Sequence, residues 1–296
     1  SKFINYLNHP DIKRIYILFI PVVIGFSIDQ INALVDTLCA SFLQEGSVTA
    51  LYYSNRLMQL PLALFAISVA TVALPQMSSE VVSNNHTELE QTIYNSLRSS
   101  MFFILPASLG LIILGKPIVK TLFEHGKFTS QATSMTYICL AFYSLGLLFF
   151  STTKIFTSVF YALKKPQYPV KIAGGMVVLN AVLNVILMQF LSVGGLALAT
   201  SITSAVASVL LYKKIREQIN FHLAGMKGFV VKILIANLIF SVCMFLLLVF
   251  IKNPVVLTLA GVTLGGGLYY LITKILKVEE TQIISSFLNR FLPSYD

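Results

Sequence analysis

Eight long apolar segments, separated by short polar stretches, follow one another along the 296-residue chain. A helix that crosses the hydrocarbon core of a bilayer needs roughly 20 predominantly apolar residues. Each segment reaches or approaches that length, and helix-breaking residues lie near the divisions, namely Gly46, Pro75, Lys116-Pro117, Lys164-Lys165-Pro166, Gly194-Gly195 and Asn253-Pro254. We therefore predict transmembrane helices over about residues 15–43, 48–75, 97–115, 132–162, 168–191, 195–213, 228–251 and 254–275.

The composition favours a membrane protein over a soluble one. Hydrophobic residues make up 56% of the chain, charged residues only 11%, and the mean hydropathy is +0.80. A formal net charge of +9 would suit nucleic acid, but in so apolar a chain basic residues more commonly orient loops and meet anionic lipid. We expect no nucleic-acid partner. The predicted fold class is all-α: a polytopic integral membrane helical bundle of about eight transmembrane helices.

The three cysteines, Cys39, Cys139 and Cys243, are widely separated, and each lies within an apolar run. This spacing indicates neither a disulfide framework nor a zinc site.

The basic residues predict the orientation of the chain. One side of the predicted membrane collects most of the lysines and arginines, whereas the other holds only Lys116, Lys120, Lys127 and Lys252. By the positive-inside rule both termini are cytoplasmic. The polar stretch 78–92 is then predicted to be a cytoplasmic linker. After the last span, one helical face carries the apolar residues of a predicted interfacial helix: Ile283, Ile284, Phe287, Leu288 and Phe291.

Four ionisable residues fall inside predicted spans: Asp29, Asp36, Arg56 and Lys154. Each costs about 2.5–3.5 kcal/mol on insertion scales unless it is paired or faces water. Asp29, Asn32 and Asp36 are spaced three and four residues apart, so they share one helix face, which we expect to line an interior cavity. The alternative is a buried structural pair in which Asp36 neutralises Arg56 or Lys154. Lys154 itself either lines the cavity or pairs with Asp29.

A second polar group lies on the fifth and sixth predicted spans. Asn180 and Asn184 are one helical turn apart, and Thr200 lies one turn beyond Leu196. Carboxylate, amide, hydroxyl and free carbonyl oxygens are ligands that small cations prefer. Asparagine and threonine in membrane helices also simply bond neighbouring helices, so both interpretations stay open at this point.

An enzyme is not favoured by the sequence. All four histidines, His9, His86, His125 and His222, lie in predicted loops or at their edges, and no GxSxG, HExxH or P-loop motif occurs.

Several segments closely resemble the MurJ (MviN) family, the lipid II flippases of the multidrug/oligosaccharidyl-lipid/polysaccharide exporter superfamily. They include Gln30-Ile-Asn-Ala-Leu-Val-Asp36, Tyr52-Tyr-Ser-Asn-Arg-Leu57, Leu122-Phe-Glu-His-Gly-Lys-Phe128 and Lys165-Pro-Gln-Tyr-Pro-Val-Lys-Ile172. The similarity extends to about residue 216 and is merely hydrophobic afterwards. Family members have fourteen spans in two lobes, and this chain resembles spans seven to fourteen. The resemblance implies a C-terminal lobe of six spans over 1–216, and two additional spans with an interfacial helix over 217–296.

The resemblance also implies roles for particular residues. Arg56 matches an essential cavity arginine, and we assign Lys154 and Asp29 to the same substrate cavity. Asp36, Asn180, Asn184, the Leu196 carbonyl and Thr200 match a sodium site, although one characterised member has aspartate where this chain has Asn184. That difference removes one negative charge and predicts weaker sodium binding.

The implied function is translocation of lipid II from the inner to the outer leaflet by alternating access, driven by membrane potential and a candidate sodium gradient. We expect no bound cofactor, and we expect lipid II, membrane lipids and a missing N-terminal lobe as partners. Because the chain begins with Ser1 rather than methionine, we expect it to be part of a longer protein. Three alternatives stay open: another transporter of the superfamily (a polysaccharide-lipid flippase or a drug/cation antiporter), a membrane enzyme acting on lipid-linked sugars, and a non-transporting scaffold lobe.

Overall fold

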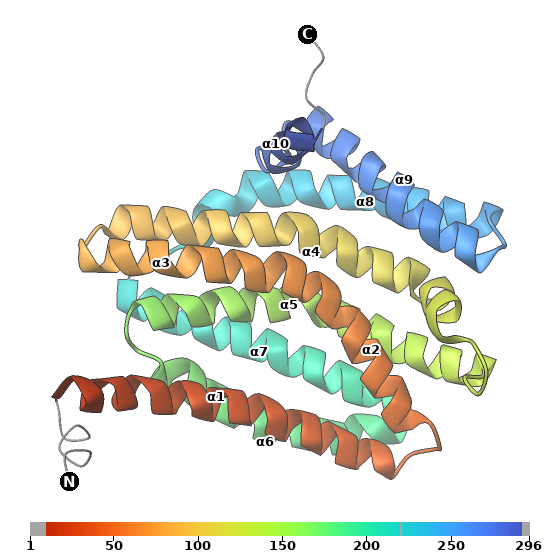
Figure 1. Ribbon diagram of the computed structural model, residues 1–296, viewed down its shortest axis with the longest axis horizontal. Helices are drawn as coiled ribbons and strands as arrows, with labels where there is room; N and C mark the ends of the chain where they lie inside the picture. The colour runs from red at the N-terminus through yellow and green to blue at the C-terminus, as the bar shows by residue number, and fades with distance from the viewer. Residues whose placement is uncertain (1–9, 220, 292–296) are drawn as a thin grey trace.

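A computed structural model describes residues 10–219 and 221–291, and all its regular elements in this part of the chain are helices (Figure 1). The elements are α1 (Pro10–Ser41), α2 (Ser47–Pro61), a π-helical segment (Leu62–Ile67), α3 (Ser68–Val82), α4 (His86–Phe123), α5 (Ser130–Ala162), α6 (Gln167–Leu191), α7 (Val193–Ile219), a short 3₁₀ helix (Leu223–Met226), α8 (Lys227–Phe250), α9 (Pro254–Ile275) and α10 (Thr281–Phe291).

The predicted membrane fold is confirmed. Seven helical segments of the described chain are long and apolar enough to cross a membrane, and α2, the π-helical segment and α3 together form one of them. The 32-residue helix α1 coincides with the remaining predicted span. Large apolar side chains point outward along many of these helices, as in α8, where Leu234, Leu238 and Val242 are more than half exposed. Such a surface suits lipid rather than water.

The predicted linker over 78–92 is wrong, because helix occupies nearly all of it. Helix α3 continues to Val82 and α4 begins at His86. Glu80 is buried, and its Oε1 accepts hydrogen bonds from Thr92 Oγ1 at 2.6 Å and Gln76 Nε2 at 3.0 Å. The Asn85 side chain caps α4. These bonds hold Glu80 Oε1 between packed helices, so the polarity of the segment does not require a loop.

Three predicted breaks also lie inside helices. Pro75 is within α3, Pro117 is within α4, and Gly194-Gly195 lies in the first turn of α7. A Cβ at Gly195 would approach the Leu187 carbonyl oxygen to 2.3 Å, so glycine is needed where α7 folds back against the end of α6. The division predicted near Gly194-Gly195 is nevertheless confirmed, because the chain breaks at Ser192 between α6 and α7, and the two glycines permit the close packing that follows the break.

The helices pack in an order that places the site at one edge of the bundle. Figure 1 shows α1 and α6 at one side, α8, α9 and α10 at the other, and α4, α5 and α7 between them. Helix α1 packs on α6, α6 on α7, and α7 on α5. One apolar core joins α4 and α5 to α8 and α9, and a second joins α2, α5 and the first part of α7.

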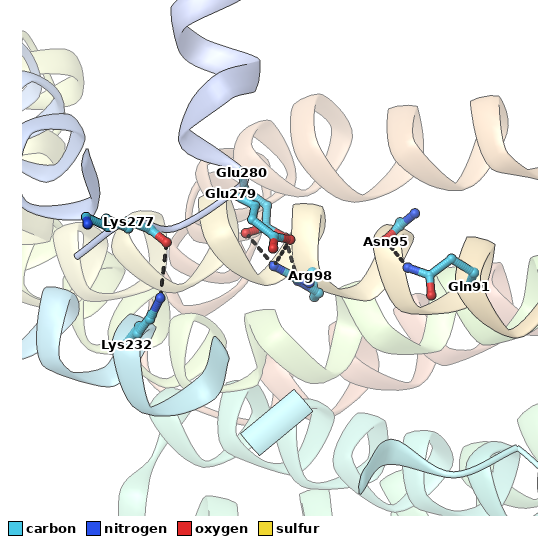
Figure 2. Close-up of polar contacts among 7 residues, drawn as sticks. All are labelled: Gln91, Asn95, Arg98, Lys232, Lys277, Glu279 and Glu280. Atoms are coloured by element: carbon cyan, nitrogen blue, oxygen red, sulfur yellow. Dashed lines mark hydrogen bonds and ion pairs between the residues drawn. The ribbon is translucent and has the colours of Figure 1, made fainter. Parts of the chain in front are cut away.

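The corner between α9 and α10 is tied to α4 by charge (Figure 2). Arg98 on α4 pairs with Glu279 at 2.8 Å and with Glu280 at 2.6 Å, and its guanidinium lies 4.9 Å from the Phe229 ring centre. Lys232 on α8 donates to the Lys277 carbonyl at 3.1 Å.

The predicted interfacial helix coincides with α10. Ile283 on it is 46% exposed, and Ile284 packs against the core of the bundle. The predicted side chains at Phe287, Leu288 and Phe291 lie outside the described part of the structure.

Candidate cation and substrate site

Three helices bring a polar cluster together around Asp36. The carboxylate of Asp36 on α1 accepts a hydrogen bond from Asn184 Nδ2 on α6 at 2.7 Å and from Thr200 Oγ1 on α7 at 3.1 Å. Asp36 is 8% exposed and Asn184 is fully buried. The sequence analysis proposed that Asp36 and Asn184 belong to one site. That arrangement requires α1 to pack on α6, as it does here.

The two other predicted members of the cluster lie one turn away on the same helices. Asn180 donates to Thr200 Oγ1 at 3.2 Å, and its own Oδ1 accepts from Asn184 at 2.9 Å. The Leu196 carbonyl oxygen also lies 3.1 Å from Thr200 Oγ1 and is the alternative acceptor to Asp36 for its single hydroxyl proton. All five predicted residues are thus linked in one buried network.

The network suits a small monovalent cation. Asn184 Oδ1 is buried without a hydrogen-bond partner, which is costly for an amide oxygen in an apolar setting. Rotating that amide by half a turn would exchange Oδ1 and Nδ2 and direct an oxygen toward Asp36. One carboxylate with neutral oxygens from Asn180, Leu196 and Thr200 compensates a single positive charge. No group of three or more His, Cys, Asp or Glu side chains gathers anywhere in the described residues, so a site for a more highly charged metal is not indicated there.

The alternative of a structural ion pair at Asp36 finds no support in the described residues. The ion pairs formed there join Arg98 to Glu279 and Glu280, Lys120 to Glu124, and Lys214 to Glu217. Asp36 instead makes its contacts to neutral side chains.

Arg56 projects from α2 into an exposed position. Its guanidinium lies 5.1 Å from the centre of the Tyr52 ring, and Nη1 donates a long 3.4 Å hydrogen bond to Gln59 Oε1. Gln59 in turn donates to Asn55 Oδ1. No carboxylate among the described residues pairs with Arg56, so its fork of donors is available to an anionic group.

Tyr143 on α5 is a residue that the sequence analysis missed. It is 3% exposed, and its hydroxyl lies near the side chains of Thr200 and Asn55. Tyr143 therefore stands between the Asp36 cluster and the helix that carries Arg56. The sequence feature that could have revealed it is a tyrosine in the middle of an apolar span, because a buried tyrosine hydroxyl usually has a polar partner.

Lys154 lines two neighbouring cavities. One, of about 160 Å³, also contains Asn32, Thr153 and Thr200, and the other, of about 390 Å³, extends past Thr157 toward the end of α5. Thr200 thus joins the wall of the smaller cavity to the Asp36 cluster. Asp29 lies on α1, but its side chain falls outside the part of the chain that the structure describes, so its proposed pairing with Lys154 stays a prediction.

Comparisons with known proteins agree with this geometry. The sequence profile described as "Lipid II flippase MurJ" matches residues 1–289. The chain belongs to the MurJ lipid II flippase family. The probable MurJ of Vibrio cholerae is 39% identical over 214 residues, covering 72% of this chain and 41% of that protein. The probable MurJ of Rickettsia prowazekii is 34% identical over 240 residues, covering 81% of this chain and 47% of that protein.

A solved structure described as lipid II flippase MurJ in an inward closed conformation matches with a TM-score of 0.77 and 30% identity, covering 90% of this chain and 56% of that one. A MATE transporter in its bent conformation matches with a TM-score of 0.62 and 14% identity, which shows a shared fold alone. The chain spans less than half the length of the two MurJ sequences it matches. The predicted division at residue 216 is not tested by these matches and stays a prediction.

Proposed function

We propose that this chain forms the C-terminal part of a lipid II flippase, which moves lipid II from the inner to the outer leaflet of the bacterial cytoplasmic membrane. One observation carries the proposal: the same MurJ-family bundle contains both Arg56 and Asp36, and neither forms an ion pair with another described residue. Arg56 is exposed, whereas Asp36 is buried and bonds only neutral side chains. The protein moves its substrate and does not change it covalently.

Arg56 supplies the substrate contact. A guanidinium donates paired hydrogen bonds in a planar fork, which suits a pyrophosphate, whereas a lysine ammonium acts as a point charge. Lys154 and Asp29 line the same cavity in this proposal. An N-terminal lobe completes the cavity, and the two lobes rock so that it opens first to the cytoplasm and then outward.

The Asp36 cluster supplies the coupling-ion site. Sodium bound by Asp36, Asn180, Asn184, Leu196 and Thr200 would neutralise the one buried carboxylate and draw α1, α6 and α7 together. Membrane potential adds about 2.3 kcal/mol per charge per 100 mV to the movement of that cation. Both termini face the cytoplasm, in accordance with the distribution of lysine and arginine.

Contacts between the two centres support a coupled mechanism. Thr200 bonds Asp36, Tyr143 lies within reach of both Thr200 and Asn55, and Gln59 joins Asn55 to Arg56. Polar side chains therefore lie along the path from the cation cluster to the substrate arginine. Substitution of Tyr143 tests whether this path couples the two centres.

The experiment is a translocation assay with the full-length protein in vesicles that contain labelled lipid II in one leaflet. We expect lipid II to become accessible in the opposite leaflet, chemically unchanged, and Arg56→Lys to abolish this movement. Covalently altered lipid II would instead support the membrane enzyme. Failure to move lipid II together with transport of another lipid-linked saccharide or of a cationic drug would support another transporter of the superfamily, and failure with every substrate would support a scaffold lobe.

A further inference from the structure

A long apolar groove lies between α8 and the helices of the main bundle, away from the Asp36 cluster. Its volume is about 580 Å³, and its walls include Met101 of α4, Leu148 and Phe156 of α5, Val209 of α7 and Val231 of α8. Val209 and Val231 are 50% and 56% exposed, so the groove is open along its length.

The groove has one charged end. Lys227, the first residue of α8, lines it. On α7 the residues Ser208 and Tyr212 line it, and Arg216 continues the same helical face one turn further. Arg216 contacts a ring nitrogen of His222 at 3.4 Å, and no carboxylate in the described chain pairs with Arg216 or Lys227. The mouth of the groove is therefore basic and its charge is not neutralised by the described residues.

The dimensions fit one leaflet of a bilayer. The α5 wall runs from Leu148 to Phe156, which is about 12 Å of helix at 1.5 Å per residue. Half of the hydrocarbon core is about 15 Å thick. An acyl chain that lies in the groove thus has its headgroup at the level of the two basic side chains.

We propose that this groove is a specific binding site for an anionic phospholipid, with an acyl chain along Leu148 and Val231 and the phosphate between Arg216 and Lys227. Apolar walls alone would accept any lipid chain, and the basic mouth selects an anionic headgroup, because a Lys or Arg near the membrane surface attracts anionic lipid. The bound lipid joins α8 to α5 and α7 across the groove, so it helps hold the last two spans on the bundle. This proposal depends on the membrane fold and not on the proposed transport activity.

The test uses the absence of tryptophan from this chain. In the full-length protein any tryptophan elsewhere is replaced by phenylalanine, and Val231→Trp places a single fluorophore in the groove. The protein is reconstituted in vesicles of equal parts phosphatidylglycerol and phosphatidylcholine, with bromine on the acyl chains of one lipid or the other. Bromine quenches tryptophan only at close range, so quenching reports which lipid occupies the groove.

We expect brominated phosphatidylglycerol to quench the Val231→Trp fluorophore more strongly, with a preference of about fivefold for each basic residue at the mouth. Lys227→Gln and Arg216→Gln should each reduce that preference. Val262→Trp, on the exposed face of α9, is the matched control and should show no preference. Val209→Trp provides a second reporter if Val231→Trp does not fold.

Equal quenching by the two lipids at both groove positions would overturn the proposal. A preference that survives Lys227→Gln and Arg216→Gln together would also overturn it, because the basic mouth would then not select the headgroup. Displacement of the quenching lipid by undecaprenyl phosphate, but not by phosphatidylglycerol, would assign the groove to a polyprenyl chain instead.

Discussion

The Asn184 side chain on α6 donates a hydrogen bond across 2.7 Å to the Asp36 carboxylate on α1. The amide therefore occupies a place beside the carboxylate where a second negative charge would strengthen attraction for a cation. Because Asn184 is neutral, the described cluster carries one formal charge, and a monovalent ion balances it. This relationship makes Asn184 the residue that sets the strength of the proposed site.

Asn184→Asp should strengthen sodium binding and lower the thermal stability of the sodium-free protein. Two carboxylates about 3 Å apart in a buried site repel each other unless a cation lies between them. We expect a larger rise in melting temperature on addition of sodium than for the wild type, from a lower starting value. Thermal unfolding in sodium and in potassium chloride at equal ionic strength measures both effects, and an unchanged sodium response would remove Asn184 from the site.

Tyr143→Phe should uncouple the Asp36 cluster from Arg56 while leaving sodium binding and lipid II binding intact. The substitution removes only the hydroxyl that lies within reach of Thr200 and Asn55, at a cost of about 1–2 kcal/mol in stability. We expect sodium-dependent stabilisation to persist while lipid II translocation loses its dependence on sodium. Tyr137→Phe is the matched control, because Tyr137 is on the same helix but bonds the Ile112 carbonyl at 3.0 Å. Sodium-dependent translocation in Tyr143→Phe would contradict the coupling route.

Arg56→Lys should fail to support cell-wall synthesis in the full-length protein while the protein accumulates normally. Lysine keeps the charge but loses the paired donors that a pyrophosphate accepts. Gln59→Ala removes the neighbour that bonds Arg56 at 3.4 Å and should have a smaller effect. Growth of cells that depend on the variant is the measurement. Wild-type growth with Arg56→Lys would show that bidentate recognition is not required.

Arg98→Ala should destabilise the attachment of α9 and α10 to α4. Glu280 is 8% exposed, and removing its partner leaves a nearly buried carboxylate uncompensated, which costs about 3 kcal/mol. The exposed pair of Lys214 and Glu217 provides the control, since Lys214→Ala should have little effect on stability. Melting temperatures in detergent compare the two. An equal drop in melting temperature for both variants would show that the Arg98 pair contributes no more to stability than an exposed pair does.

Much of the site could be predicted because helical periodicity places residues one turn apart on one face. Asn180 with Asn184, and Leu196 with Thr200, are such pairs, whereas the prediction that they form one site with Asp36 came from the family resemblance. Asp36 joins them because α1 packs on α6.

Other features depend on packing that periodicity does not encode. Tyr143 lies in a helix with apolar residues on most sides, so its neighbours could not be inferred from spacing. Glu80 was assigned to a linker because polar residues surround it in sequence, yet its partner Thr92 lies on the next helix and lowers the cost of burying it. The glycines at 194 and 195 correctly indicated the break at Ser192, but their close approach to α6 becomes visible only in three dimensions.

Sodium binding at Asp36 is the central claim, and a thermal shift measures it most directly. Purified full-length protein is heated in sodium, potassium or choline chloride at equal ionic strength, alongside Asp36→Asn. Specific binding raises stability with ligand concentration, by about 2.7 kcal/mol at one hundred times the dissociation constant. We predict a melting temperature that rises with sodium alone, and no such rise in Asp36→Asn. Equal melting temperatures for the wild type in all three salts, up to high concentration, would contradict the cation site.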